Sequence, residues 1–370
     1  MTPLESEIRQ RIESEGPMSV GDYMALCLTH PTHGYYTTGH PVGGRASPNR
    51  EGGDFITAPE ISQMFGEMIA IWCMEVWQAL GAPKPFTLAE IGPGRGTLMA
   101  DLLRVANALP EFVEAADIHL VEISPTLAEQ QSLTLSQNTS HMKWVRDISA
   151  LPEQPTIVIA NELLDALPLR QWMKIESRWI ERAIGLKDDQ LHFVTRPASL
   201  ELTDLPDGHT ACADGTIFET SAPRESLVAS IADHLNSRTG AALFIDYGHL
   251  KSGFGDTFQA MKDHEFVSTL ETPGTADLTS HVDFAPLVQT AEAQGCIAPT
   301  PVTQGKFLLS LGLLERAGNL GHGRDQKVQE NLQTAVNRLV APEQMGELFK
   351  VMAFGAPQSL GARWPGFDDG

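Results

Sequence analysis

The stretch Glu90-Ile91-Gly92-Pro93-Gly94-Arg95-Gly96 decides the fold. It joins an apolar run at residues 86–91 to a helical pattern that begins at Thr97. Glycines let a backbone turn sharply and approach a ligand, and the amides at a helix N-terminus then face that ligand. The stretch therefore predicts a ligand site between the first strand of a sheet and the helix that follows it.

Strand and helix patterns alternate on both sides of this turn. Further strands are expected at residues 117–122, 143–145, 156–160 and 241–246, with helices opening at Ser124-Pro125 and covering 222–236. Such alternation predicts an α/β fold with a doubly wound, mostly parallel, Rossmann-like sheet. In such sheets ligands bind beyond the carboxyl ends of the strands, where the strand order reverses.

The domain organisation follows from where the alternation begins. Residues 1–84 are expected to form a helical N-terminal segment with a long glycine-rich loop at 32–59, and residues 85–370 the main domain. Two insertions are expected in that domain, strand hairpins near 170–216 and helices near 308–347.

The glycine spacing selects among nucleotide-like ligands. The dinucleotide pattern G-x-G-x-x-G would need a glycine at Thr97, so an oxidoreductase is disfavoured. An acidic residue at Glu90 followed by G-x-G-x-G resembles the first motif of class I S-adenosylmethionine (SAM) methyltransferases. That resemblance implies cofactor contacts at Glu90, Gly92, Pro93, Gly94 and Gly96.

Polar residues follow the next strands in turn. Glu122, beside Ile123, can accept hydrogen bonds from two ribose hydroxyls, and Asp147, beside Ile148, can meet an adenine amino group. Asn161 ends the fourth strand, next to the expected sulfonium. For each carboxylate alone, helix capping or solvation is the commoner role, but the series after successive strands favours a cofactor site.

A longer resemblance covers most of the chain. The segment from Gly53 to Glu67, GDFITAPEISQMFGE, is similar to the hallmark of the MidA family, as are the stretches at 121–125, 160–168, 244–248, 277–284, 303–305 and 345–351. The resemblance implies a SAM-dependent protein-arginine methyltransferase, related to the mitochondrial member that acts on a respiratory complex I subunit. Leu163-Leu164 departs from the family pattern, in which two aromatic residues are expected.

Glu162 is expected to be the main catalytic carboxylate, with Asp165 assisting. An arginine guanidinium is cationic and a poor nucleophile, so carboxylates must orient it and accept a proton as the methyl group is transferred. For Asp165, capping of the turn before Pro168 is an equally good interpretation.

Four further residues are expected near the acceptor or over the cofactor. Residues 52–60 are expected to cover the cofactor, with Thr57 contacting it and Asp54 facing the substrate; a structural loop before a capped helix is the alternative. Tyr247 is expected either to line the acceptor channel or to pack against a neighbouring loop. His281, with Asp277 and Asp283, is expected to guide a cationic substrate. The alternative is a structural role, in which Thr279 or Asp283 caps a helix.

The composition limits the classes of partner that we expect. The formal net charge is −21, which disfavours nucleic acid and anionic lipid and favours a protein or peptide that is basic at the target site, although the acidity could serve solubility alone. The four scattered cysteines and the histidines show no metal-binding spacing, so no metal is expected. No signal peptide or apolar span appears, so we expect a cytoplasmic protein, and a homodimer is compatible with the sequence. Small-molecule methylation and SAM binding without turnover are the alternative functions.

Overall fold

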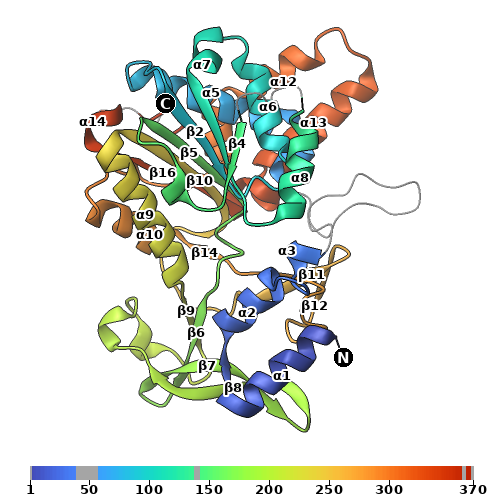
Figure 1. Ribbon diagram of the computed structural model, residues 1–370, viewed down its shortest axis with the longest axis vertical. Helices are drawn as coiled ribbons and strands as arrows, with labels where there is room; N and C mark the ends of the chain where they lie inside the picture. Colours follow the sequence, from blue (N-terminus) through green and yellow to red (C-terminus); the bar gives the residue numbers. More distant parts are fainter. Residues whose placement is uncertain (1, 39–56, 137–141, 361–363, 368–370) are drawn as a thin grey trace. The chain divides into compact units, whose positions relative to one another are not determined.

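The computed structural model describes residues 2–38, 57–136, 142–360 and 364–367 (Figure 1). The chain divides into two compact units, each assembled from separated segments. The first unit comprises Met1–Phe55, Leu164–Ser226 and Lys251–His281, and the second Ile56–Leu163, Leu227–Leu250 and Val282–Gly370. The predicted N-terminal segment, 1–84, contributes to both units.

The first unit contains short helices and two antiparallel sheets. Its helices are α1 (Pro3–Glu15), α2 (Val20–Thr29) and α3 (Tyr35–Thr38). One sheet contains β1 (Met18–Ser19), β6 (Arg170–Ile175), β7 (Arg178–Lys187), β8 (Gln190–Ser199) and β9 (Ile217–Thr220). The other contains β11 (Gln259–Lys262), β12 (Glu265–Val267) and β13 (Asp277–Thr279). The strand hairpins expected near 170–216 are confirmed by the antiparallel pairs β6–β7 and β7–β8.

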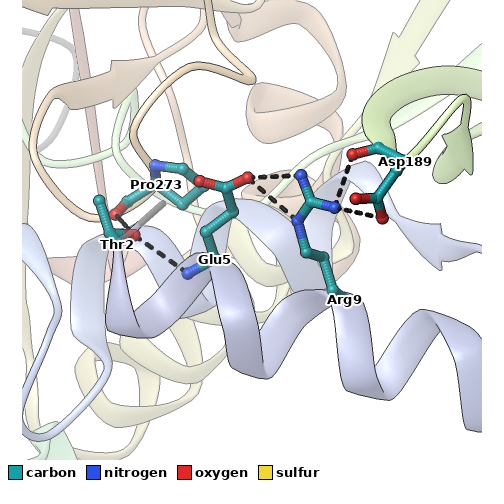
Figure 2. Close-up of polar contacts among 5 residues, drawn as sticks. All are labelled: Thr2, Glu5, Arg9, Asp189 and Pro273. Atoms are coloured by element: carbon teal, nitrogen blue, oxygen red, sulfur yellow. Dashed lines mark hydrogen bonds and ion pairs between the residues drawn. The ribbon is translucent and has the colours of Figure 1, made fainter.

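Polar contacts of the N-terminal half of α1 attach this helix to the rest of the first unit (Figure 2). The Thr2 hydroxyl accepts a hydrogen bond from the Glu5 amide at 3.0 Å and donates one to the Pro273 carbonyl at 3.1 Å. One turn along, Arg9 pairs with Glu5 and donates to the carbonyl and carboxylate of Asp189 at 2.6 and 2.9 Å. The helix also buries Leu4, Ile8 and Ile12, so an apolar stripe and a cap fix it together.

The second unit is built on a mixed sheet with the strand order β15-β16-β10-β5-β2-β3-β4. The five parallel strands are β2 (Phe86–Ile91), β3 (Ala116–Val121), β4 (Met142–Val145), β5 (Thr156–Asn161) and β10 (Gly240–His249). Two antiparallel strands, β16 (Phe349–Gly355) and β15 (Val302–Thr303), extend one edge, and β14 (Val282–Asp283) pairs in parallel with the end of β10. Chain order reverses between β2 and β5, as expected for a doubly wound sheet.

Helices flank this sheet. They are α4 (Ala58–Ile61), α5 (Gln63–Ala79), α6 (Thr97–Ala106), α7 (Pro110–Ala115), α8 (Pro125–Thr134), α9 (Ala222–Arg238, which begins in the first unit), α10 (Phe284–Ala293), α11 (Gln304–Ser310), α12 (Leu313–Gly321), α13 (Gln326–Val340) and α14 (Pro357–Leu360). Figure 1 shows α9 and α10 next to each other, and the Asn236 side chain on α9 donates to the Gln294 carbonyl beyond α10. Short 3-10 turns at Ile148–Ala150, Leu202–Asp204 and His209–Ala211 and a π-turn at Pro342–Gly346 complete the assignment.

The helices on either side of β2 can be compared with the sequence pattern. The apolar stretch at 60–80 forms two helices, because the extended backbone of Ser62 ends α4 and its side chain caps α5 by accepting from the Met64 amide. The helix expected to begin at Thr97 does so and ends at Ala106. The expected helical character of 308–347 is confirmed by α11, α12 and α13. Within the described residues no helix is long and apolar enough to cross a bilayer.

Candidate functional site

Register places three predicted polar residues on one face of the sheet in the second unit. Glu90 lies opposite Leu120 of β3 and Ile159 of β5. Side chains alternate along a strand, so Glu122 and Asn161, each two residues further along, face the same side as Glu90. That face also carries the large apolar core against α5 and α6. Glu90, Glu122 and Asn161 therefore lie at the carboxyl ends of neighbouring strands, on the face that carries the apolar core.

The glycine turn after β2 requires glycine at specific positions. Gly92 has a φ of 64°, and a Cβ there would lie 2.8 Å from Cδ1 of Leu163. Gly96 has a φ of 80° and is the N-cap of α6, so a larger residue would strain the backbone at the start of that helix. The turn is held by a bond from the Gly96 amide to the Pro93 carbonyl at 2.8 Å. The backbone thereby leads directly from the strand into the helix N-terminus.

Glu122 is held in place by two donors. Its Oε1 accepts from the Ser124 amide at 2.7 Å and its Oε2 from Nε2 of Gln131 at 2.9 Å. Burial raises the pKa of Glu122 above its ordinary value, and these hydrogen bonds oppose part of that shift. Each oxygen retains a second lone pair, so the carboxylate can still accept from ligand hydroxyls. Gln131 was missed in the sequence, where it is one polar residue in a largely polar helix.

Two of the buried side-chain acceptors that have no partner among the described residues lie at this sheet edge. They are Oε2 of Glu90 and Oδ1 of Asn161, which share one sheet face on adjacent strands. Burial raises the pKa of Glu90 to about 8, because a charged carboxylate there lacks water. An unpaired buried acceptor is costly, so both atoms favour a ligand that carries hydrogen-bond donors.

Asp147 and the two isoleucines lie at the exposed edge of the site. Asp147 is exposed and caps the 3-10 turn Ile148–Ala150 by accepting from the Ser149 amide at 2.8 Å. Hydrogen bonding from the Ser149 side chain, and then from its amide, lowers the pKa of Asp147. The capping role weighed from the sequence is thus present, and the adenine contact stays a prediction. Ile123 is 59% exposed directly after β3 and Ile148 is partly exposed, so both have apolar surface free to pack against a ring.

Glu162 adopts an unusual backbone conformation at the end of β5. Its φ is 50°, which a residue other than glycine rarely adopts. The Leu163 amide donates to Oδ2 of buried Asp246 at 3.1 Å, so β10 fixes the peptide that follows Glu162. Oε1 of Glu162 accepts from the Ala58 amide and from Nδ2 of Asn161, both at 3.0 Å. Asp246 is a second residue that the sequence reasoning missed.

The beginning of α4 adjoins the glycine turn. Thr57 is the N-cap residue of α4, and no side-chain cap bond is made. Three residues on, the Glu60 carboxylate accepts a 2.6 Å hydrogen bond from the hydroxyl of Thr97, the first residue of α6. Asp54, predicted to face the substrate, lies outside the described residues, as does most of the loop at 52–60.

Asp165 belongs to the first unit, where it is buried with other polar groups. Burial raises its pKa above the ordinary value, and the positive charge of Arg224 opposes that shift. Tyr36 donates to Oδ1 of Asp277 at 2.9 Å, and its own pKa is raised by burial and then by the charges of Asp277 and Asp165. The first unit thus gathers a tyrosine and two carboxylates.

His281 and Tyr247 have structural contacts. The His281 amide donates to the Thr257 hydroxyl at 3.0 Å, and its carbonyl accepts from Arg224 at 2.8 Å. Tyr247 is buried and packs against Phe349 with ring centroids 5.7 Å apart, which is the packing alternative left open by the sequence. Asp283 caps α10, which is the structural alternative given for it from the sequence. Roles of Tyr247 and His281 toward the acceptor stay predictions.

Comparison with known proteins identifies the family of this chain. Residues 68–302 match the family described as "Putative S-adenosyl-L-methionine-dependent methyltransferase". The chain belongs to that family. The methyltransferase is 35% identical over 375 residues to protein arginine methyltransferase NDUFAF7, mitochondrial, of Xenopus laevis, with 92% of this chain and 81% of the relative covered.

Further relatives agree. The Homo sapiens protein of the same name is 35% identical over 394 residues, with 97% of this chain and 85% of the relative covered. A Burkholderia thailandensis protein crystallised with S-adenosyl-homocysteine (SAH) is 27% identical and aligns 99% of this chain with 95% of its own at a TM-score of 0.84. SAM is therefore the cofactor of this α/β methyltransferase.

The second unit's polar groups fit that cofactor. SAM carries an ammonium and two ribose hydroxyls as donors, which is the chemistry that the unpartnered oxygens of Glu90 and Asn161 and the remaining lone pairs of Glu122 require. When bound, the cofactor supplies a sulfonium-linked methyl group. The protein's part is to hold the donor and the acceptor in line, since positioning can lower such barriers by roughly 7–11 kcal/mol. Within the described residues no cluster of His, Cys, Asp or Glu could hold a metal ion.

Proposed function

We propose that this methyltransferase transfers a methyl group from SAM to an arginine side chain of a protein partner. The observation that carries the proposal is the 35% identity, over 92% and 97% of the chain, to two relatives named protein arginine methyltransferases. The partner is basic at its target site and, by family resemblance, a respiratory complex I subunit. The net charge of −21 supports a cationic partner and disfavours nucleic acid.

Glu162 is the proposed catalytic carboxylate. Arginine has a pKa above about 12, so its guanidinium must be held by carboxylates and lose a proton during transfer. Glu162 supports that role because it follows β5 at the same sheet edge as Asn161 and because Asp246 and the Ala58 amide fix its conformation. By family resemblance Asp165 is proposed to assist; its burial favours the neutral form and makes it a candidate to accept and release protons near neutral pH.

The sheet of the second unit is proposed to be the Rossmann-like class I type. Numbering its main strands along the chain, the order β4-β3-β2-β5-β10-β16-β15 reads 3-2-1-4-5-7-6, with β16 antiparallel to β10. This order puts the reversal between β2 and β5, beside the glycine turn that the motif assigns to the cofactor. The cofactor contacts of Glu122, Ile123, Asp147, Ile148, Asn161 and Thr57 rest on this assignment.

Labelled methyl transfer tests the proposal. The enzyme is incubated with radiolabelled SAM and a fractionated cell extract, and labelled products are hydrolysed to amino acids. We expect labelled methylarginine in a protein fraction, and its absence with Glu162→Gln. Label in a small metabolite would replace the proposal with small-molecule methylation, and SAM binding without any labelled product would replace it with a binding factor.

Location and assembly are proposed separately. We propose a cytoplasmic, homodimeric protein that does not insert into membranes. Cell fractionation tests the location, and light scattering combined with size-exclusion chromatography tests the dimer. Recovery in the membrane fraction after a salt wash would contradict the first proposal, and a monomeric mass would contradict the second.

A further inference from the structure

Gln131 connects three parts of the cofactor end of the second unit. It lies on α8 and is fully buried. Its Nε2 donates to the Gly94 carbonyl at 2.8 Å and to Oε2 of Glu122 at 2.9 Å, and its Oε1 accepts from Nε1 of Trp144 at 2.9 Å. One carboxamide therefore joins the glycine turn after β2, the carboxylate after β3 and the indole of β4.

The orientation of this carboxamide is determined by its neighbours. The Trp144 indole can only donate, and the Gly94 carbonyl and a charged Glu122 can only accept. The oxygen of Gln131 must face Trp144 and its two N–H groups must face the other two partners, because the flipped amide would lose all three bonds. Among the twenty side chains only an amide offers two donors on one atom and an acceptor on the other, and asparagine is one methylene shorter.

The backbone of α8 also approaches the glycine turn at this residue. A Cβ at Gly96 would lie 3.6 Å from the Cα of Gln131 and 3.3 Å from Cδ1 of Leu135. A side chain at Gly96 would thus meet Gln131 and Leu135, and the turn is hydrogen-bonded to α8 at Gly94. Gly94 and Gly96 are the residues whose amides and carbonyls form the surface expected to receive the cofactor.

We propose that Gln131 is a positioning residue for SAM, which clamps the glycine turn to Glu122 and holds both in their cofactor-binding arrangement. Rigid placement before binding reduces the ordering cost that binding must overcome. The clamp also opposes protonation of Glu122 and so favours the carboxylate that can accept from the ribose hydroxyls. Burial raises the pKa of Glu122 and the Gln131 donor lowers it, so losing that donor raises the pKa further.

Calorimetric titration of the full-length protein with SAH between pH 5.5 and 8.5 tests this role. The variants are Gln131→Met, which keeps length but removes both donors, and Gln130→Met, a matched control on the same helix. We expect Gln131→Met to bind SAH at least roughly 10-fold more weakly at pH 7.5, the loss expected for one charge-assisted hydrogen bond. The deficit should grow as the pH falls, because Glu122 becomes protonated at a higher pH than in the wild type.

Gln131→Glu gives the opposite pH dependence and keeps the shape of the side chain. One new oxygen still accepts from Trp144, but the other faces Glu122 as a like charge. Relative to the wild type at the same pH, its SAH affinity should be lowest at high pH and recover as the pH falls, when a proton shared between the two carboxylates restores a donor. A purely structural residue would change the melting temperature without reversing the pH dependence.

Two results would overturn the proposal. One is a folded Gln131→Met variant that binds SAH within twofold of Gln130→Met at every pH. The other is a deficit in SAH affinity, relative to the wild type at the same pH, that changes with pH in the same direction in Gln131→Met and Gln131→Glu. If one variant is too unstable to titrate, a deficit in the other that is constant with pH overturns the proposal. The titration uses no methyl acceptor, so its result is independent of the proposed arginine substrate.

Discussion

The backbone amide of Ala58 donates a hydrogen bond of 3.0 Å to Oε1 of Glu162. Ala58 is the first residue of α4, and Glu162 directly follows β5. The carboxylate proposed to act on the acceptor thus also holds the first turn of a helix whose Glu60 side chain is bonded to Thr97 beside the glycine turn. The proposed catalytic and cofactor-binding elements of the second unit are linked through this short helix.

Replacing Glu162 with glutamine separates catalysis from binding. The amide oxygen of glutamine can still accept from the Ala58 amide, so SAH affinity should stay within a few-fold of the wild type. Methyl transfer should fall roughly 100- to 10,000-fold, because the variant cannot take a proton from the acceptor. Calorimetry with SAH and labelled methyl transfer measure the two effects. Glu153→Gln, an exposed change before the same strand, should alter neither; full activity of Glu162→Gln would remove Glu162 from the mechanism.

Cofactor binding should release a proton from Glu90 near neutral pH. Burial raises the pKa of this carboxyl to about 8, so at pH 7 it is mostly protonated in the free protein. An ammonium donor beside it would favour the carboxylate. SAH titrations in buffers of different ionisation enthalpy should show net proton release at pH 7, and Glu90→Gln should abolish it. Identical proton counts for the two proteins would contradict the assignment of Glu90.

The raised pKa of Glu90 also predicts how the stability of the cofactor-free protein depends on pH. Its folded-state pKa lies above the unfolded value of 4.5, so the folded protein binds more protons between pH 4.5 and about 8. Stability relative to Glu90→Gln must therefore fall as the pH rises through that window, at up to about 1.4 kcal/mol per pH unit. Urea unfolding of both proteins at pH 5, 6.5 and 8 measures it. A difference that is constant with pH would contradict the prediction.

The main strands of the second unit and the position of the glycine turn were predicted closely from the sequence. The strand expected at 86–91 is found at those residues, and the one expected at 156–160 ends one residue later. Such buried parallel strands read as apolar runs bounded by turn residues. Antiparallel β16 was missed because a short apolar run after a helical stretch cannot be distinguished from a helix end by periodicity.

The sequence could not predict which side chains contact one another. Gln130 and Gln131 are adjacent, and only the rotation of α8 decides that Gln131 is the one inside. Glu162 and Asp165 are three residues apart, yet they belong to different compact units because the chain leaves one for the other at residue 164. Local patterns record which residues can form an element, whereas such assignments depend on contacts between segments far apart in sequence.

A buried ion cluster joins α5, α6 and α12 in the second unit. Glu67 is 1% exposed, accepts two bonds from Arg316 and pairs with Arg104 at 2.9 Å. Burial alone would raise the pKa of Glu67, but the two arginines outweigh it and the net pKa is lowered. A lowered pKa contributes stability above the unfolded value of 4.5, which is lost as the pH falls through the folded value.

Glu67→Gln should therefore cost roughly 1–3 kcal/mol of unfolding free energy at pH 7. The cost should shrink as the pH falls below 4.5, because the carboxylate of the unfolded chain binds a proton before the carboxylate of the folded protein does. The control is Glu114→Gln, whose partner Lys84 is exposed and whose loss should matter by less than about 1 kcal/mol. Urea unfolding at pH 7 and pH 4 measures both variants; an equal loss for the two at pH 7 would show that the cluster contributes no more than a surface pair.

Arg224 holds together two segments of the first unit. It is buried, and its guanidinium donates to the carbonyls of Leu164 at 2.6 Å and His281 at 2.8 Å and to the Ser280 hydroxyl at 2.6 Å. Longer bonds reach the carbonyls of Asp165 and Ser280. Only the planar guanidinium can direct donors to so many acceptors at once, because a lysine ammonium is a single point with three donors.

Arg224→Lys should thus be destabilising although it conserves charge. We expect a loss of roughly 2–4 kcal/mol, since carbonyls that are buried would be left without donors. Urea unfolding followed by tryptophan fluorescence measures it, with Arg178→Lys on the exposed side of β7 as the same substitution without buried partners. Because the held segment contains Asp165, methyl transfer should also fall in folded Arg224→Lys while SAH binding by the second unit is retained. Equal unfolding midpoints for the two lysine variants would mean that water replaces the guanidinium without cost.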